Sequence, residues 1–180
     1  MYERPWQRLV SWLPPALGLA AVVAWASLRV EPHFALWFVF PALVGAVLGI
    51  GFAWLARFCR LADFKLLVAG TLIAGMLCVA MQHWFAYRQV LEQFRQREAA
   101  LLAKAPLAGA LALAGEQPPA NVWQFLREDA ATGRVLVGGW RAEGVACWLS
   151  WGLDAMLVLV GALAMVLLWR PRLPGPTASA

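Results

Sequence analysis

Four long apolar stretches, separated by polar segments, are the feature that most limits what this chain can fold into. They run from about Leu9 to Leu28, Phe34 to Ala56, Leu66 to Tyr87 and Trp148 to Trp169. A hydrocarbon core about 30 Å thick is crossed by about 20 helical residues, because each residue rises about 1.5 Å. The sequence therefore predicts an all-α integral membrane protein with four transmembrane helices.

The composition of the 180-residue chain supports this class and excludes several others. Apolar residues make up 62% and charged residues 14%, whereas soluble domains contain about 45–50% and about 25%. A net charge of +5 spread over so few charges does not predict a nucleic-acid surface, and flanks of membrane spans explain it instead. The apolar content excludes intrinsic disorder, and three cysteines do not make a disulfide scaffold.

The orientation follows from where lysine and arginine lie near the spans, since the cytoplasmic side collects them. One predicted side holds Arg4, Arg8, Arg57, Arg60, Lys65, Arg170 and Arg172, whereas the short connector 29–33 on the other side holds Arg29 alone. We therefore expect both termini in the cytoplasm, residues 170–180 as a cytoplasmic tail, and residues 88–147 outside. The Ala, Leu, Gly and Arg bias, without a transit-peptide pattern, indicates a bacterial inner membrane.

The first span also resembles a signal peptide, because Ala24-Trp25-Ala26 fits an A-x-A cleavage site. A cleaved signal peptide and an intact first span are both compatible with the sequence, and cleavage would leave the remaining topology unchanged. The apolar stretch is long enough to span, which favours an uncleaved first helix. The tryptophans fit the predicted topology, since indole rings prefer the membrane interface. Nine of them lie near predicted span ends: Trp6, Trp12, Trp54 and Trp169 inside, and Trp25, Trp37, Trp84, Trp148 and Trp151 outside.

We predict that residues 88–147 form a small extracytoplasmic helical cap between the third and fourth helices. Its first part, 88–105, carries alternating charges at helical spacing and looks like the third span continuing out of the membrane. Asn121 fits the N-cap of a helix that closes near Gly133, and residues 134–140 read as a short extended piece with a Gly-Gly turn. Such a small segment buries little by itself. We expect Trp123, Trp140 and Phe94 to contact the spans or a partner.

Asp154 is the most informative single residue, because an ionisable side chain within a span costs roughly 2.5–3.5 kcal/mol on insertion scales. The outer half of the third span offers His83 and Gln82 as partners. A structural hydrogen bond, a proton or cation relay and a contact with another subunit are the three interpretations. The inner halves of the spans carry no matching ionisable residue, which argues against a complete transport path in one copy.

Glycines predict where helices pack closely. Gly45 and Gly49 form a Gly-x-x-x-Gly pattern in the second span, and Gly70 and Gly75 lie among small residues in the third. Such faces let helix backbones approach each other. We expect the second and third spans to pack on each other there, with self-association as the alternative.

Specific chemistry has little support in the sequence. His33 and His83 are the only histidines and could bind haem or a metal, but their spacing matches no ligand motif. Cys147 is expected to be a buried thiol, with an intermolecular disulfide as the alternative. Phosphate-binding, dinucleotide-binding, hydrolase and zinc-protease motifs are absent from the sequence.

We therefore expect a non-enzymatic accessory or scaffold subunit of a larger membrane assembly, without a cofactor and without nucleic acid, in contact with the lipid bilayer and with a protein partner or another copy. A homo-oligomeric proton- or cation-linked transporter using Asp154 and His83 is the second hypothesis. A haem- or metal-binding redox protein using His33 and His83 is the third.

Overall fold

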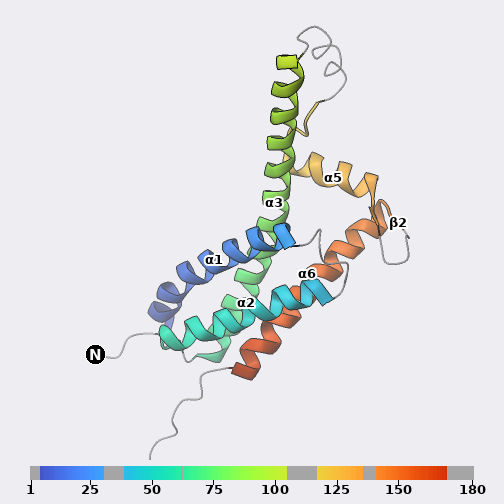
Figure 1. The fold of residues 1–180 in the computed structure, drawn as a ribbon. Helices are drawn as coiled ribbons and strands as arrows, with labels where there is room; N and C mark the ends of the chain where they lie inside the picture. Colours follow the sequence, from blue (N-terminus) through green and yellow to red (C-terminus); the bar gives the residue numbers. More distant parts are fainter. Residues whose placement is uncertain (1–4, 31–38, 62, 105–116, 136–140, 170–180) are drawn as a thin grey trace, which may run out of the picture. The chain divides into compact units, whose positions relative to one another are not determined.

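The structure, a computed structural model, describes residues 5–30, 39–61, 63–104, 117–135 and 141–169. The elements are α1 (Pro5–Val30), α2 (Val39–Phe58), α3 (Phe64–Lys104), α5 (Val122–Thr132), β1 (Arg134–Val135), β2 (Arg141–Ala142) and α6 (Val145–Trp169) (Figure 1). The chain forms two compact units, described separately below. The first unit comprises residues 1–81 and 150–180, and the second unit comprises residues 82–149.

Four of the described helices, α1, α2, α3 and α6, are long and apolar enough to cross a membrane. This confirms the predicted number of span-length helices and places them at the four predicted stretches. α1 begins four residues before the predicted start at Leu9, and α6 begins three residues before Trp148. α3 runs for 41 residues, so the predicted continuation of the third stretch into a charged helix is also confirmed.

Two prolines lie inside α1, because the helix begins at Pro5 and places Pro14 and Pro15 in its interior. A proline lacks the N–H that would bond to the carbonyl four residues earlier. For Pro15 that carbonyl belongs to Ser11, and the Cys59 thiol donates to it over 3.9 Å. A weak donor directly after α2 thus compensates for a bond that α1 cannot make by itself.

The glycines of α2 pack against α6, which differs from the predicted contact between the second and third spans. A Cβ atom added to Gly45 would collide with the backbone of Val158, and one added to Gly49 would collide with the backbone of Ala162. The contact is reciprocal, since a Cβ at Gly161 would lie 2.7 Å from the carbonyl oxygen of Ala42. Small residues on both helices therefore allow their backbones to meet.

The glycines of α3 also mark close packing, with partners other than α2. A Cβ on Gly70 would lie 2.6 Å from the Trp12 ring of α1, and one on Gly75 would lie 2.7 Å from the Leu159 side chain of α6. The expected partner was wrong because all four helices are rich in small and apolar residues. Such sequences show that a face packs closely, and they do not say against which neighbour.

Trp12 belongs to the core of the first unit and is not the interfacial anchor that the sequence predicted. Its side chain is completely buried. The ring meets Phe52 edge-on, with 5.6 Å between centroids, and its Nε1–H donates to the Phe52 carbonyl oxygen over 3.2 Å. A buried indole needs such a partner for its N–H. By contrast, Trp6, Trp25, Trp54, Trp84, Trp148 and Trp169 are exposed in the chain, as the interfacial interpretation requires.

A tight turn ends α2, and the start of α1 lies next to this turn. The Arg60 N–H donates to the Arg57 carbonyl, and the Leu61 N–H donates to the Ala56 carbonyl, which is the Schellman pattern of helix termination. Arg60 has a φ of 52°, in the left-handed region that favours glycine. The Arg8 guanidinium donates to the Arg60 carbonyl over 3.0 Å and so ties α1 to this turn.

The second unit contains the C-terminal part of α3, the helix α5, the β1–β2 pair and the first turn of α6. Phe125 of α5 packs on Tyr87 of α3, with ring centroids 5.8 Å apart, and the Tyr87 hydroxyl donates to the Pro119 carbonyl over 3.4 Å. Leu126 and Ala130, which follow on α5, are buried. A few aromatic and small side chains therefore hold this unit together.

Local capping of α5 agrees with the sequence prediction. The Asn121 side chain accepts from the Gln124 N–H over 2.9 Å, and Gly133 ends the helix with a φ of 79°. After it, β1 and β2 pair antiparallel with Arg134 opposite Ala142, which confirms a short extended piece at 134–135. The predicted Gly138-Gly139 turn lies outside the described residues.

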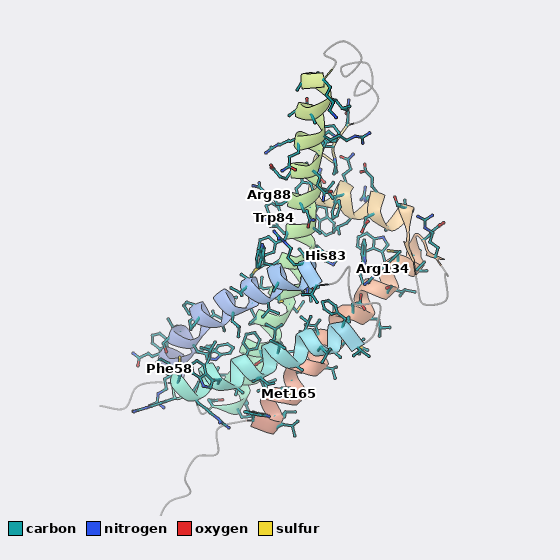
Figure 2. All side chains as sticks on the ribbon, in the orientation of Figure 1. Phe58, His83, Trp84, Arg88, Arg134 and Met165 are labelled. Carbon is teal, nitrogen blue, oxygen red and sulfur yellow. The ribbon has the colours of Figure 1, made fainter. Side chains whose placement is uncertain are left out.

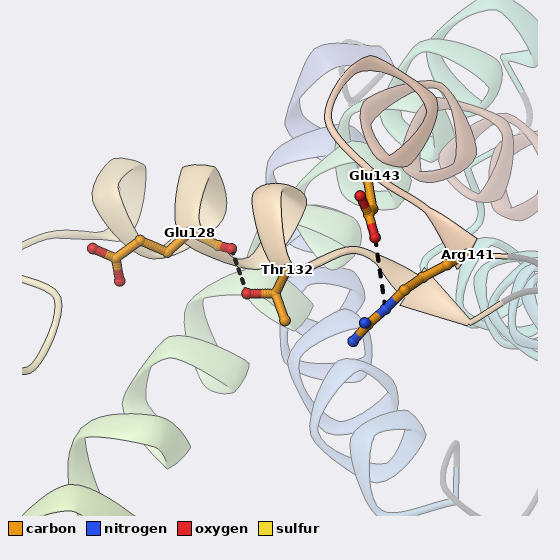
Figure 3. Close-up of polar contacts among 4 residues, drawn as sticks. All are labelled: Glu128, Thr132, Arg141 and Glu143. Carbon is orange, nitrogen blue, oxygen red and sulfur yellow. Dashed lines mark hydrogen bonds and ion pairs between the residues drawn. The ribbon is translucent and has the colours of Figure 1, made fainter.

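Side chains on the surface of this segment make further polar contacts (Figure 3). The Thr132 hydroxyl donates to the Glu128 carbonyl over 2.9 Å in the last turn of α5. Arg141 of β2 pairs with Glu143 over 4.0 Å. Because both charged side chains are exposed, this ion pair adds little to stability.

Candidate functional site

The predicted intramembrane cluster of Asp154, His83 and Gln82 draws on both units. Asp154 is half-buried in α6, within the first unit, whereas Gln82 and His83 are half-buried on α3, within the second. The cluster therefore remains a prediction. What the structure does describe is the set of charged groups around His83 inside the second unit.

His83 lies within electrostatic reach of Asp129, which is on α5 and 46 positions later in the chain. Partial desolvation raises the pKa of the Asp129 carboxyl above its ordinary value of 3.8, while the charges of His83 and of Arg134 oppose this rise. Figure 2 labels His83 on α3 and Arg134 next to α5. Asp129 is exposed as a residue, so solvent screens these interactions considerably.

This polar group of His83, Asp129 and Arg134 was missed at the sequence level, and no local signal identifies it. The three residues belong to α3, α5 and β1, and only the packing of Phe125 and Leu126 brings α5 to α3. An acid, an imidazole and a guanidinium in one place can hold a proton or an anionic group. The buried Cys147 thiol lies close enough to Asp129 and Arg134 for their charges to act on it.

Metal ligation has no site within the residues that the structure describes, where no three His, Cys, Asp or Glu side chains gather as a metal would require. His33, the second histidine of the predicted redox site, lies outside the described residues, so that prediction is not tested. Cys147 is a free, buried thiol, as expected for it.

The predicted partner-binding residues differ in exposure. Trp123 of α5 has 69% of its surface exposed, although Leu126, one turn later, is buried. Phe94 is half-buried on α3, and Trp140 lies outside the described residues. The residues that join α5 to α3 are Phe125 and Tyr87, so Trp123 does not serve as the anchor within this unit.

The C-terminal part of α3 presents a long charged surface. Within residues 88–104 the side chains of Leu91, Phe94 and Leu101 are half-buried, while every other residue is exposed. Glu92 accepts a hydrogen bond from Gln96 over 3.2 Å, one turn along the same face. The helix thus carries a narrow apolar stripe within a polar surface, which is typical of a helix that packs on one neighbour.

Comparison with known proteins adds no relative: no family model, no curated protein and no solved structure matches this chain.

Proposed function

We propose that this chain is a multi-pass protein of the bacterial inner membrane, with four spans, cytoplasmic termini and an extracytoplasmic cap formed by residues 88–147. Four span-length apolar helices support insertion. Two contacts within the first unit support the topology. Arg8 donates to the Arg60 carbonyl and Arg57 donates to the Trp169 carbonyl, so the start of α1 and the ends of α2 and α6 meet at one end of the unit.

The meeting of these helix ends matters because it collects positive charge. Arg8, Arg57, Arg60 and Lys65 all lie at or next to them. Lysine and arginine near span ends favour the cytoplasmic side. An arrangement in which consecutive spans alternate in direction accounts for this gathering.

Cysteine labelling of intact cells tests the topology. In a chain whose three native cysteines are replaced by serine or alanine, Glu98→Cys on the outer part of α3 and Lys65→Cys at its start form a matched pair, since both native residues are exposed. A membrane-impermeant maleimide is expected to label position 98 in intact cells and position 65 only after lysis. Labelling of position 65 alone in intact cells would overturn the proposed orientation.

We further propose that the protein acts as a non-enzymatic accessory or scaffold subunit, whose cap binds a partner protein or a second copy. The observation that carries this proposal is the exposure of Trp123 beside the buried face of α5. Tryptophan contributes strongly to binding hot spots, and a large exposed ring next to a packed face is a suitable anchor. The half-buried Phe94 on α3 adds apolar surface to the same unit.

Co-purification in a mild detergent tests this role. The native chain is expected to elute with a stoichiometric protein or as a defined oligomer, and Trp123→Ala should reduce that association by about tenfold or more, as for a hot-spot residue. Arg127→Ala, which removes an exposed side chain from the same helix, is the matched control and should leave it intact. Recovery of a lone monomer from native membranes would contradict the proposal.

A further inference from the structure

A second feature of the first unit is an apolar groove between α1 and α2, at the end where positive charge gathers. Its volume is about 500 Å³ and it is open to the surface. The lining residues are Ser11, Pro15, Trp54, Leu55, Phe58 and Cys59. In size it matches sites for small organic molecules, which are concave and mostly apolar.

The walls of the groove are exposed aromatic rings. Trp54 and Phe58, one turn apart on α2, stack with centroids 6.1 Å apart, and 64% and 78% of their respective surfaces are exposed. Figure 2 labels Phe58 at the end of α2, where the start of α1 lies alongside. Exposed aromatic rings at the end of a spanning helix lie at the level of lipid headgroups.

The α1 side of the groove is lined by Ser11 and Pro15, where a proline interrupts the helical hydrogen bonding. Pro15 lines the groove and leaves the Ser11 carbonyl without its usual helical donor, and the Cys59 thiol occupies that place. The compact side chains of Pro15, Ser11 and Cys59 thus line the groove where longer side chains would fill space.

Two arginines lie close in the chain to residues that line the groove. Arg8 lies one turn before Ser11 on α1, and the Ser11 hydroxyl donates to the Arg8 carbonyl over 2.9 Å. Arg60 follows Cys59 directly and receives the Arg8 guanidinium on its carbonyl. The nearest acidic residue in the sequence, Asp63, accepts from the Lys65 and Leu66 N–H groups at the start of α3. Arg8 and Arg60 are thus joined to each other and lie close in the chain to Ser11 and Cys59, which line the groove.

Arginine is an unusual residue at position 60. Its φ of 52° is a conformation that costs a side chain more than glycine, and helices that end this way usually have glycine there. Placing an arginine at this position is unfavourable for the turn alone. It does place a positively charged residue directly after Cys59, which lines the groove.

We propose that this groove binds one anionic phospholipid from the bilayer, with an acyl chain along Trp54 and Phe58 and the phosphate held by Arg8 and Arg60. Arginine recognises phosphate through paired, charge-assisted hydrogen bonds. The proposal rests on the membrane insertion proposed above, and it adds a specific lipid site to it.

Native mass spectrometry of the detergent-purified chain tests the site without depending on its orientation in the cell. Equal amounts of dioleoyl phosphatidylglycerol and dioleoyl phosphatidylcholine compete, and one bound phosphatidylglycerol is expected with about tenfold preference, the change that a charge-assisted contact produces. Equal retention of the two lipids would overturn the proposal. So would binding of sn-glycerol 3-phosphate alone at the affinity of the full lipid, because the groove would then contribute nothing.

Matched variants locate the site. Arg8→Gln with Arg60→Gln should reduce the preference for phosphatidylglycerol about tenfold or more. Arg57→Gln removes the same charge at the same helix end. The Arg57 guanidinium donates to the end of α6, whereas Arg8 belongs to α1, which lines the groove, and is joined to Arg60, so this control should retain the preference. Phe58→Ala, at a highly exposed side chain, should weaken both lipids without unfolding the chain.

Two results would contradict this assignment. One is an equal loss in the Arg57 control, which would indicate general attraction by the basic end. The other is a protein found in the groove in place of lipid. If the double variant does not fold, the competition on the native chain and the Phe58→Ala variant still decide the question. A failed topology experiment with a retained lipid preference would reject the orientation and keep the site.

Discussion

The two units of this protein are held together by different kinds of contact. In the first unit helix backbones meet, because Gly45, Gly49 and Gly161 leave no room for a Cβ atom between α2 and α6. In the second unit side chains make the contact between helices, chiefly the rings of Tyr87 on α3 and Phe125 on α5. The first arrangement suits lipid, where close packing and not water drives helix association. The second suits an aqueous surface, where apolar burial does.

This difference means that the two units should respond differently to the same kind of substitution. Adding atoms should harm the first unit, because backbone cannot move aside as a flexible side chain can. Removing the cap of α5 should harm only the second unit, because α5 belongs to that unit. Hydrogen exchange followed by mass spectrometry reports on each segment separately, so it can show which unit a change affects.

The largest effect is expected from Trp12→Ala in the first unit. The completely buried ring contacts Phe52 and rests on Gly70, and truncating such a side chain costs about 3–5 kcal/mol. Thermal unfolding in detergent should show a large loss, with faster exchange in α1 and α2. Trp6→Ala, at an exposed ring on the same helix, should cost less than about 0.5 kcal/mol. Equal losses would mean that Trp12 is not part of a core.

The next effect tests whether backbone contact defines the first unit. Gly45→Ala should destabilise it by about 1–3 kcal/mol, because the added methyl group meets the Val158 backbone. Gly152→Ala adds the same methyl group to α6 where nothing lies within 4 Å. It should stabilise the helix by up to about 1 kcal/mol. If the two variants change the melting temperature in the same direction, α2 and α6 do not pack as described.

A smaller effect is expected in the second unit from Asn121→Ala. Its side chain caps α5 through the Gln124 N–H, and losing such a cap costs about 1 kcal/mol. Exchange of the α5 amides should become faster, while the amides of α1 and α2 remain unchanged. Arg127→Ala on the same helix should change exchange by less than about 0.5 kcal/mol. Faster exchange in α2 would contradict the separation of the two units.

Features that depend on nearby sequence were predictable. Span-length helices follow from hydropathy alone, and the Asn121 cap and the Gly133 stop follow from residues within one helix. The continuation of α3 past Tyr87 was also predictable, because the charged segment consists of good helix formers. In each case a few consecutive residues carry the whole physical reason.

Features that depend on distant residues were not predictable. The four span-length helices are apolar on every side, so no polar face indicates which side of each helix packs against its neighbours. For this reason Gly45 was assigned to the wrong neighbour and Trp12 was assigned to the interface. The approach of Asp129 to His83 depends on aromatic packing between α5 and α3, which a single sequence does not encode in any local pattern.

The smallest effect concerns Asp129, and it gives the second unit a pH dependence. Desolvation raises the pKa of Asp129 in the folded chain, against the lowering effects of His83 and Arg134, whereas the unfolded chain keeps the ordinary value of 3.8. The folded state therefore holds this proton more tightly. The contribution of Asp129 to stability is therefore largest below pH 3.8 and falls as the pH rises through the folded pKa. Asp129→Asn should abolish that fall, seen as α5 exchange that no longer accelerates with pH beyond its intrinsic rate. The same result from Glu128→Gln would show that any α5 carboxylate suffices, and would contradict a specific role for desolvation at Asp129.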